Sequence, residues 1–258
     1  MGPLMCREGA WVELTVLVTA GLFDSKQDAW FFYLENNMKY LKTRQAVFVS
    51  RPNRFIANVE IDGQPEVVHV KNTGRCKELL IPGVTVILEE GQNPNRKTKY
   101  DLVAVYKEGF GLINMDSQAP NKVVGEWLET KGYDFIKPEY TIGDSRIDFY
   151  MEKGENRYLM EIKGCTLEVD GVGYFPDAPT LRGVKHLREL ARLSSKGYHC
   201  KVGFVIQMEG VDKVFPNEKT HPEFKEALSE AREQGVEVLF FLCKVKEDEL
   251  YIWKELKG

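Results

Sequence analysis

The chain has 258 residues, of which 43% are hydrophobic and 29% are charged, and its formal net charge is −4. These values are typical of a globular protein and exclude a disordered chain or a uniformly basic nucleic-acid binder. The five cysteines form no CxxC pair and are odd in number, which disfavours a zinc site or a disulfide framework. This cysteine usage predicts a reducing, cytoplasmic compartment.

Charge is distributed unevenly along the chain. Residues 38–110 carry 12 basic and 8 acidic side chains, whereas residues 1–37 and 111–258 each have an acidic excess. The middle segment is therefore the part of the chain best suited to contact a polyanion.

Residues 1–37 precede Met38, where the sequence resembles an ordinary protein N-terminus. Their apolar stretch, residues 11–22, is interrupted by Glu13 and preceded by only one basic residue, Arg7. It is too short to span a membrane and makes a poor signal peptide, so no membrane association is predicted. We interpret residues 1–37 as an extension that arises from a mis-assigned start. A genuine N-terminal helix is the alternative.

The next segment, residues 38–114, has a β pattern. Turn signals such as Asp62-Gly63 and Pro82-Gly83 separate five runs rich in β-branched and aromatic residues, and a short helix is expected at residues 76–80. The five runs are residues 47–49, 54–61, 66–70, 84–88 and 102–106. Such a pattern fits a five-stranded OB-like β-barrel. An SH3-like barrel and an open meander fit the pattern nearly as well.

Residues 115–258 change to an α/β pattern, which predicts a mixed sheet flanked by helices. Asn121 is a candidate cap for the first helix, and Asp177 is a candidate cap for a second, longer helix. The expected helices are residues 121–130, 177–196 and 222–234, and the expected strands lie around residue 140 and at 147–151, 158–162, 202–206 and 236–242.

Two acidic residues and a lysine stand out on neighbouring strands of this second domain. Side chains alternate faces along a strand, so Glu161 and Lys163 project on the same side. A hairpin turn at residues 153–156 brings Asp148 close to Glu161. Glu139, at the start of the preceding strand, is a candidate additional acid.

Such a group suits a hard divalent cation, and we expect Asp148 and Glu161 to bind Mg²⁺ or Mn²⁺. Lys163 would orient a water for attack on a phosphodiester, and these three residues are the predicted catalytic set. An acid followed by Glu-x-Lys is also common on exposed strands, and Arg146 with Asp148 could form a plain surface ion pair.

Basic and amide side chains near these strands and in the first domain are candidates for phosphate contact. One group follows the Asn-Thr-Gly turn of the first domain, and another lies on one face of the long helix. The alternatives are a plain strand-to-helix turn and ordinary helix salt bridges. The candidates are Arg51, Arg54, Lys71, Asn72, Arg75, Arg146, Arg182, Lys185 and His186.

Several strings together resemble the sugar fermentation stimulation protein A family, in family order and over most of the chain from residue 39 onward. They are residues 51–55, 72–75, 82–83, 145–149, 161–163, 175–178 and 182–187. The resemblance implies an OB-like domain, a PD-(D/E)xK nuclease-like domain, DNA binding and a regulatory link to sugar utilisation genes. In nuclease terms, Asp148, Glu161 and Lys163 match the core triad. Residues 1–37 have no counterpart, and Cys76 stands where many members carry Met.

The leading interpretation is a cytoplasmic DNA-binding protein whose second domain keeps a metal-dependent nuclease site. The alternative is a non-catalytic DNA-binding regulator of sugar (maltose) metabolism genes, in which the nuclease-like domain is a scaffold. A sugar- or metabolite-binding protein is a third reading that only the family name suggests. The sequence makes no prediction of the oligomeric state.

Overall fold

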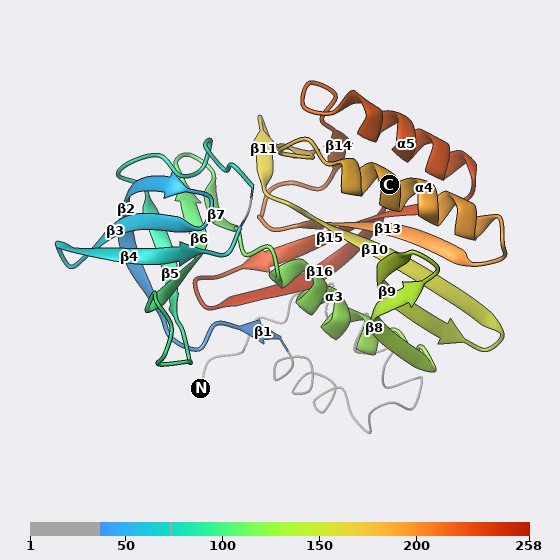
Figure 1. Cartoon of the computed structure of the whole chain (residues 1–258), viewed down its shortest axis with the longest axis horizontal. Helices are drawn as coiled ribbons and strands as arrows, with labels where there is room; N and C mark the ends of the chain where they lie inside the picture. The colour runs from blue at the N-terminus through green and yellow to red at the C-terminus, as the bar shows by residue number, and fades with distance from the viewer. Residues whose placement is uncertain (1–36, 73) are drawn as a thin grey trace, which may run out of the picture.

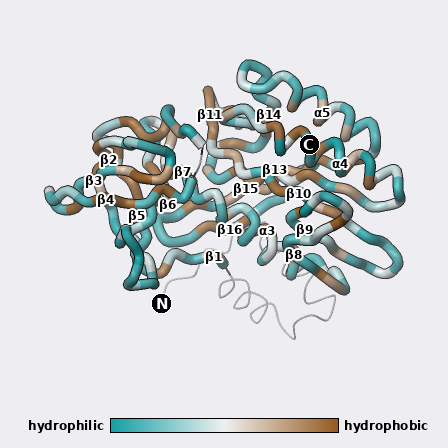
Figure 2. The backbone as a smooth tube through the Cα atoms, in the orientation of Figure 1, coloured by the Kyte–Doolittle hydropathy of each residue, from teal (hydrophilic) through white to brown (hydrophobic). Residues whose placement is uncertain are grey.

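The structure is a computed structural model that describes residues 37–72 and 74–258. The extension expected at residues 1–37 lies outside the described residues apart from its last position. The chain forms a β-barrel followed by a larger layered α/β unit (Figure 1). Hydrophobic residues follow the strands of both units, whereas the loops are mostly hydrophilic (Figure 2). The apolar core fills the barrel and the space between the large sheet and its helices.

Five strands close the barrel, and the pairing of β4 with β6 joins its two ends in parallel. A closed five-stranded barrel confirms the OB-like prediction and excludes the open meander. Inward residues alternate with outward ones, as Ala57, Val59 and Ile61 show on β3. The strands are β2 (Thr43–Asn53), β3 (Ile56–Ile61), β4 (Gln64–Val70), β5 (Thr85–Glu90) and β6 (Tyr100–Lys107), with β7 (Gly111–Asn114) beside β6.

The short helix expected at residues 76–80 is only a turn, in which the amide of Leu80 donates to the carbonyl of Cys76 at 2.9 Å. Five residues cannot offset the cost of helix nucleation, and a Pro-Gly pair follows at once. The buried side chains of Cys76, Leu79 and Leu80 instead close one end of the barrel core.

The second unit is built on a seven-stranded mixed sheet with the order β1-β16-β15-β13-β10-β9-β8. Strands β10, β13 and β15 are parallel, and the remaining pairs are antiparallel. The strands are β1 (Met38–Lys39), β8 (Phe135–Ile142), β9 (Ser145–Lys153), β10 (Asn156–Cys165), β13 (His199–Ile206), β15 (Glu237–Val245) and β16 (Glu249–Lys257). A small second sheet holds β11 (Leu167–Val169), β12 (Val172–Phe175) and β14 (Val214–Pro216).

Helices cover both faces of the large sheet, as expected. Helix α3 (Ala119–Glu129) packs on one face, and α4 (Leu181–Ser194) and α5 (Pro222–Glu233) pack together on the other. Both helix caps expected from the sequence are wrong. Thr180, not Asp177, caps α4, because its hydroxyl accepts the amide of Gly183 at 3.0 Å. Helix α3 begins at Ala119, so Asn121 lies within its first turn.

A buried polar network joins the barrel to the large sheet. The amide of Gln207, just past the end of β13, donates to the side chain of Asn114 at 2.9 Å and to the carbonyl of Asp116 at 3.1 Å. Asn114 in turn donates to the hydroxyl of Tyr40 at 2.8 Å. Buried groups that satisfy one another in this way fix a single geometry, so the network sets the orientation of the barrel toward the sheet.

Among the residues that the structure describes, no helix is long and apolar enough to cross a membrane.

Candidate functional site

Asp148 is held where β9 and β10 separate. Their ladder ends at the pair Phe149 and Met160, one position before Asp148 would pair with Glu161. The amide of Ile162 instead donates to Oδ2 of Asp148 at 2.7 Å. Burial, together with the nearby charge of Glu161, raises the pKa of Asp148. The predicted hairpin and the proximity of the two acids are therefore confirmed.

Asn121 is the residue of this site that the sequence analysis missed. Its side-chain amide, on the first turn of α3, donates to Oδ1 of Asp148 at 2.8 Å. Because the cap was placed on Asn121 itself, its side chain was expected to serve the helix. Pro120 is typical of the first turn of a helix and indicates that α3 begins two residues before Asn121. With that start, the side chain of Asn121 is not needed as a cap.

Glu161 lies deeper than Asp148 and is only 2% exposed. Lys163 donates to its Oε1 at 2.6 Å, and Nδ1 of His186 contacts the same oxygen. Burial opposes ionisation, but the hydrogen bonds from His186 and Lys163 outweigh it and lower the pKa of Glu161. The other oxygen, Oε2, is buried and has no hydrogen-bond partner among the described residues. A buried carboxylate oxygen without a partner requires an explanation, because leaving it unpaired is costly.

This donor set fits a hard divalent cation. Two carboxylates from adjacent strands converge, and one carboxylate oxygen is buried and free to act as a ligand. No group of three or more His, Cys, Asp or Glu side chains in the described part of the chain is arranged to hold a metal ion. A cation here would take two protein carboxylates and complete its shell with other oxygens, which suits Mg²⁺ or Mn²⁺.

Glu139 lies opposite Asp148 in the register of β8 and β9, between the pairs Pro138–Phe149 and Tyr140–Ile147. Its backbone has a φ of 53°, which interrupts the ladder at this position. Its carboxylate accepts from Nε of Arg146 at 2.7 Å, and both side chains are exposed. Arg146 is therefore paired with Glu139, and the surface ion pair considered between Arg146 and Asp148 does not form.

The candidates on α4 separate into two groups. Arg182 and Lys185 are exposed, as phosphate contact requires. His186 is only 7% exposed and contacts Glu161 where α4 packs on the large sheet. Nε of Arg182 donates to Nε2 of His186 at 3.3 Å, which links the exposed cation to the buried acid. The geometry gives His186 a role in positioning Glu161 in place of an open phosphate contact.

Three barrel candidates are already engaged within the protein. Arg51 donates to four backbone carbonyls, those of Arg54, Asn72, Gly74 and Arg75, at 2.6–2.9 Å. The side chain of Asn72 donates to the carbonyl of Met115 and accepts the amide of Gly74.

Lys71 forms ion pairs with Glu89 at 3.3 Å and with Asp116 at 3.2 Å. Arg51, Asn72 and Lys71 thus hold the loop after β4 in place. Arg54 and Arg75 remain exposed.

The sequence falls into two regions that match known domains. Residues 49–115 match the SfsA N-terminal OB domain, and residues 118–249 match the sugar fermentation stimulation protein RE domain. The sugar fermentation stimulation protein homolog of Desulfitobacterium hafniense (strain DSM 10664 / DCB-2) is 57% identical over 217 residues, which cover 83% of this chain and 94% of that protein. The homolog of Ruminiclostridium cellulolyticum is 50% identical over 224 residues, with coverages of 85% and 99%.

A solved structure supports the same assignment. SfsA of Pyrococcus furiosus, determined in complex with Ca²⁺, superposes with a TM-score of 0.74 at 29% sequence identity. The similarity covers 85% of this chain and 98% of that one. Both domain matches and the extent of these similarities show that the chain belongs to the sugar fermentation stimulation protein family.

Proposed function

We propose that the protein binds DNA and that its second domain is a nuclease that uses Mg²⁺ or Mn²⁺ at Asp148 and Glu161. The observation that carries the proposal is the buried, unpartnered Oε2 of Glu161 close to a second carboxylate whose pKa is raised. The Ca²⁺ complex of the Pyrococcus relative supports a site for a divalent cation. Ca²⁺ and Mg²⁺ both select oxygen ligands.

The residues of the site have distinct tasks in this proposal. Asp148 and Glu161 supply the ligand oxygens, while Asn121 and the amide of Ile162 keep the Asp148 carboxylate in one orientation. Bound there, a divalent cation supplies Lewis-acid chemistry that promotes deprotonation of water. Lys163, largely buried beside Glu161, places an ammonium where it can stabilise negative charge on a scissile phosphate.

Exposed cations indicate how a nucleic acid would approach. Arg182 and Lys185 project from α4 close to His186, which contacts Glu161. Arg54 and Arg75 add positive charge on the barrel side. Phosphate contacts of this kind contribute affinity but no base specificity. We propose DNA as the natural partner. We also propose a cytoplasmic location, which the free cysteines at 76, 165, 200 and 243 support.

The name of the relatives links them to sugar fermentation. A second candidate built on that link is a DNA-binding regulator of sugar metabolism genes without catalytic activity. It shares the cationic surface with the first candidate. The two differ in whether the carboxylate pair acts on the bound strand.

One experiment distinguishes them. Wild type, Asp148→Ala and Glu226→Ala are incubated with single-stranded and double-stranded DNA and with Mn²⁺, and Ca²⁺ binding is titrated calorimetrically in parallel. Glu226 is exposed on α5, so Glu226→Ala is the control that also removes one acidic side chain. We expect cleavage and Ca²⁺ binding in wild type and Glu226→Ala, and loss of both in Asp148→Ala. Metal and DNA binding without cleavage of either substrate would favour the regulator.

A further inference from the structure

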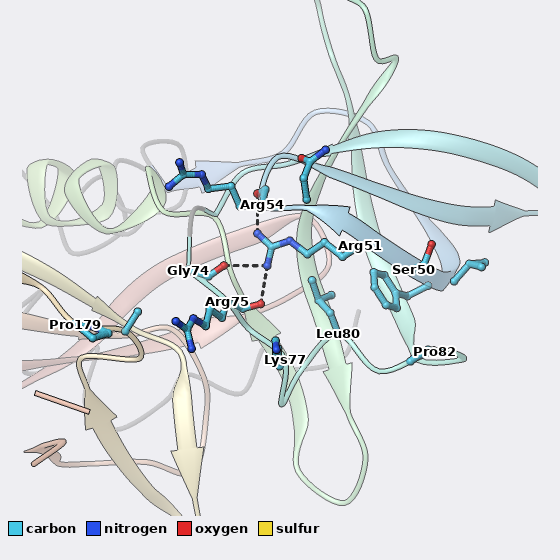
Figure 3. A pocket seen from close by; sticks show the side chains of 13 residues that line it. Ser50, Arg51, Arg54, Gly74, Arg75, Lys77, Leu80, Pro82 and Pro179 are labelled. Carbon is cyan, nitrogen blue, oxygen red and sulfur yellow. Dashed lines mark hydrogen bonds between the residues drawn. The ribbon is translucent and has the colours of Figure 1, made fainter. Parts of the chain in front are cut away.

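A cavity of about 700 Å³ lies between the barrel and the loop that leads into α4. Barrel residues from β2, from the turn after it and from the loop after β4 form most of its wall (Figure 3). Ala178 and Pro179, from the second unit, complete it. The volume is within the range of pockets that bind small molecules or single nucleotides.

The cavity combines apolar walls with a cationic rim. Phe48, Leu80, Pro82, Ala178 and Pro179 present carbon surface to it. Besides Arg51, which is engaged with backbone carbonyls, three cations line the cavity, namely Arg54, Arg75 and Lys77. All three are exposed, and none forms an ion pair with any residue in the described ranges. Arg75 does interact with the charge of Asp177, which lies beside Gly74, so the positive charge of the three cations is only partly compensated. Such a cluster is suited to an anionic ligand.

The rim is held in place by the protein itself. Arg51 donates to the backbone carbonyls of Arg54 and Arg75, at 2.7 Å and 2.8 Å, so one guanidinium fixes the positions of two rim cations (Figure 3). The second unit also approaches closely here. A Cβ on Gly74 would lie 2.3 Å from Oδ2 of Asp177, so only glycine admits this contact without a shift. The site is therefore built in advance of binding.

The position of the cavity relates it to the carboxylate site. Pro179 lies just before Thr180, the cap of α4, and Arg182 and Lys185 follow on the exposed side of that helix. His186, which contacts Glu161, stands about 8 Å along the helix axis from Leu181 at a rise of about 1.5 Å per residue. A strand that leaves the cavity along α4 would meet exposed cations and then the carboxylates.

We infer that this cavity holds one unstacked nucleotide of a single-stranded nucleic acid, with the base on the apolar wall and a phosphate at Arg75 and Lys77. The inference rests on the proposed function and specifies the strand that the protein prefers. A base within a duplex is paired and stacked, so it cannot enter a concave pocket without being extruded. A single strand offers its bases and phosphates together.

The test measures binding in EDTA, where cleavage and metal binding are suppressed. A fluorescein-labelled single-stranded DNA of about 12 nucleotides and the matching duplex are titrated by fluorescence anisotropy at several salt concentrations. We expect the single strand to bind about tenfold more tightly than the duplex. Free dAMP should compete only weakly, because it lacks the neighbouring phosphates.

Two variants address the two parts of the cavity. Arg75→Ala/Lys77→Ala removes the contacts to one phosphate, so it should weaken single-strand binding about tenfold and reduce the slope of log K against log salt by about 0.7. Ala178→Phe fills the cavity without changing charge, so it should weaken binding and leave the slope unchanged. The control Lys219→Ala/Lys254→Ala removes two exposed cations that do not line the cavity.

Equal affinity for single strand and duplex would overturn the inference, as would unchanged single-strand binding in folded Ala178→Phe. Binding of dAMP as tight as that of the strand would overturn the strand assignment. Failure of the proposed nuclease is a separate result, because it appears as absent cleavage or absent Ca²⁺ binding while the EDTA measurements stand by themselves.

Discussion

Nδ1 of His186 contacts Oε1 of Glu161, which joins helix α4 to strand β10 through two buried side chains. Because Nε of Arg182 donates to Nε2 of the same ring, the ring proton lies on Nδ1 and is donated to the carboxylate. Lys163 donates to the same oxygen. The two donors hold the carboxylate in one orientation and leave Oε2 available as a ligand.

The first prediction concerns this orientation. His186→Ala should lower the affinity for Ca²⁺ about 10- to 100-fold, as the loss of an outer hydrogen-bond partner of a metal ligand typically does. It should also destabilise the fold by about 1–3 kcal/mol, because a buried charged acceptor loses one of its two side-chain donors. Calorimetric Ca²⁺ titration and urea denaturation measure the two effects.

His186→Gln keeps a donor on a side chain of similar reach, so it should restore part of the Ca²⁺ affinity. His199→Ala is the matched control, because the exposed His199 ring hydrogen-bonds to Asn156 and stacks on Tyr158 but does not contact Glu161. Wild-type Ca²⁺ affinity in a folded His186→Ala protein would contradict the positioning role.

Strand periodicity was sufficient to predict the carboxylate pair. The alternation on β10 and the turn at residues 153–156 placed Glu161 and Lys163 on one side and Asp148 nearby, and the structure confirms both. The pattern of β-runs likewise predicted the barrel strands, although their ends moved by several residues. Short-range rules work for the carboxylate pair because Asp148, Glu161 and Lys163 lie within the single hairpin of β9 and β10.

Contacts between side chains and residues of other helices, strands or loops were less predictable from the sequence. His186 has the helical spacing of a surface residue with Arg182, yet it lies beside the buried stripe of Val184, Leu187 and Leu190 and turns inward. Spacing identifies a helix face but not which polar residue at its border is covered. Arg51 was likewise predicted to contact a phosphate. The tertiary structure shows that its guanidinium instead donates hydrogen bonds to backbone carbonyls.

Strands β1 and β16 were absent from the prediction for a related reason. Met38–Lys39 is too short to show a period, and Glu249–Lys257 has four consecutive apolar or aromatic residues followed by mixed charged and apolar ones, with no period of two. Their pairing with each other and with β15 joins residues distant in sequence. Such long-range pairing is decided by packing, which local pattern does not encode.

The second prediction concerns the junction between the two units. Gln207→Leu removes the donor to the Asn114 side chain and the Asp116 carbonyl in a site that is 1% exposed. Each of these two buried acceptors keeps one backbone amide donor and loses the other donor, so we expect a loss of about 1–3 kcal/mol in the free energy of unfolding. Urea denaturation measures it, with the exposed Gln92→Leu as control. Equal stability of the two variants would show that the junction does not depend on this network.

The third prediction is a pH dependence at Glu126. Burial raises the pKa of this α3 residue to about 7, although its carboxylate accepts the amide of Met38 at 2.9 Å. The folded pKa lies above the unfolded value, so ionisation opposes folding. Stability from this group is fully present below about pH 4.5 and is lost as the pH rises through about 7.

Glu126→Gln should therefore be more stable than wild type at pH 8, by roughly 1 kcal/mol after allowance for the solvent that reaches this partly buried group. The difference should vanish near pH 5. Denaturation of both proteins across this range measures the difference, and the exposed Glu226→Gln on α5 is the control. A difference that does not change with pH would contradict the assignment.

The last prediction concerns Arg51. A lysine at this position has one nitrogen and three donors, so it cannot reach the four carbonyls that the guanidinium fork joins. Arg51→Lys keeps the charge but should destabilise the fold by about 1–3 kcal/mol and increase amide exchange at residues 74–76. Hydrogen exchange with mass spectrometry and urea denaturation measure these effects. Arg157→Lys, at an exposed position on β10, controls for the substitution itself. If the charge of Arg51 alone were sufficient, Arg51→Lys would have the stability and amide exchange of this control. If the four hydrogen bonds of the guanidinium are required, amide exchange at residues 74–76 increases although the charge is unchanged.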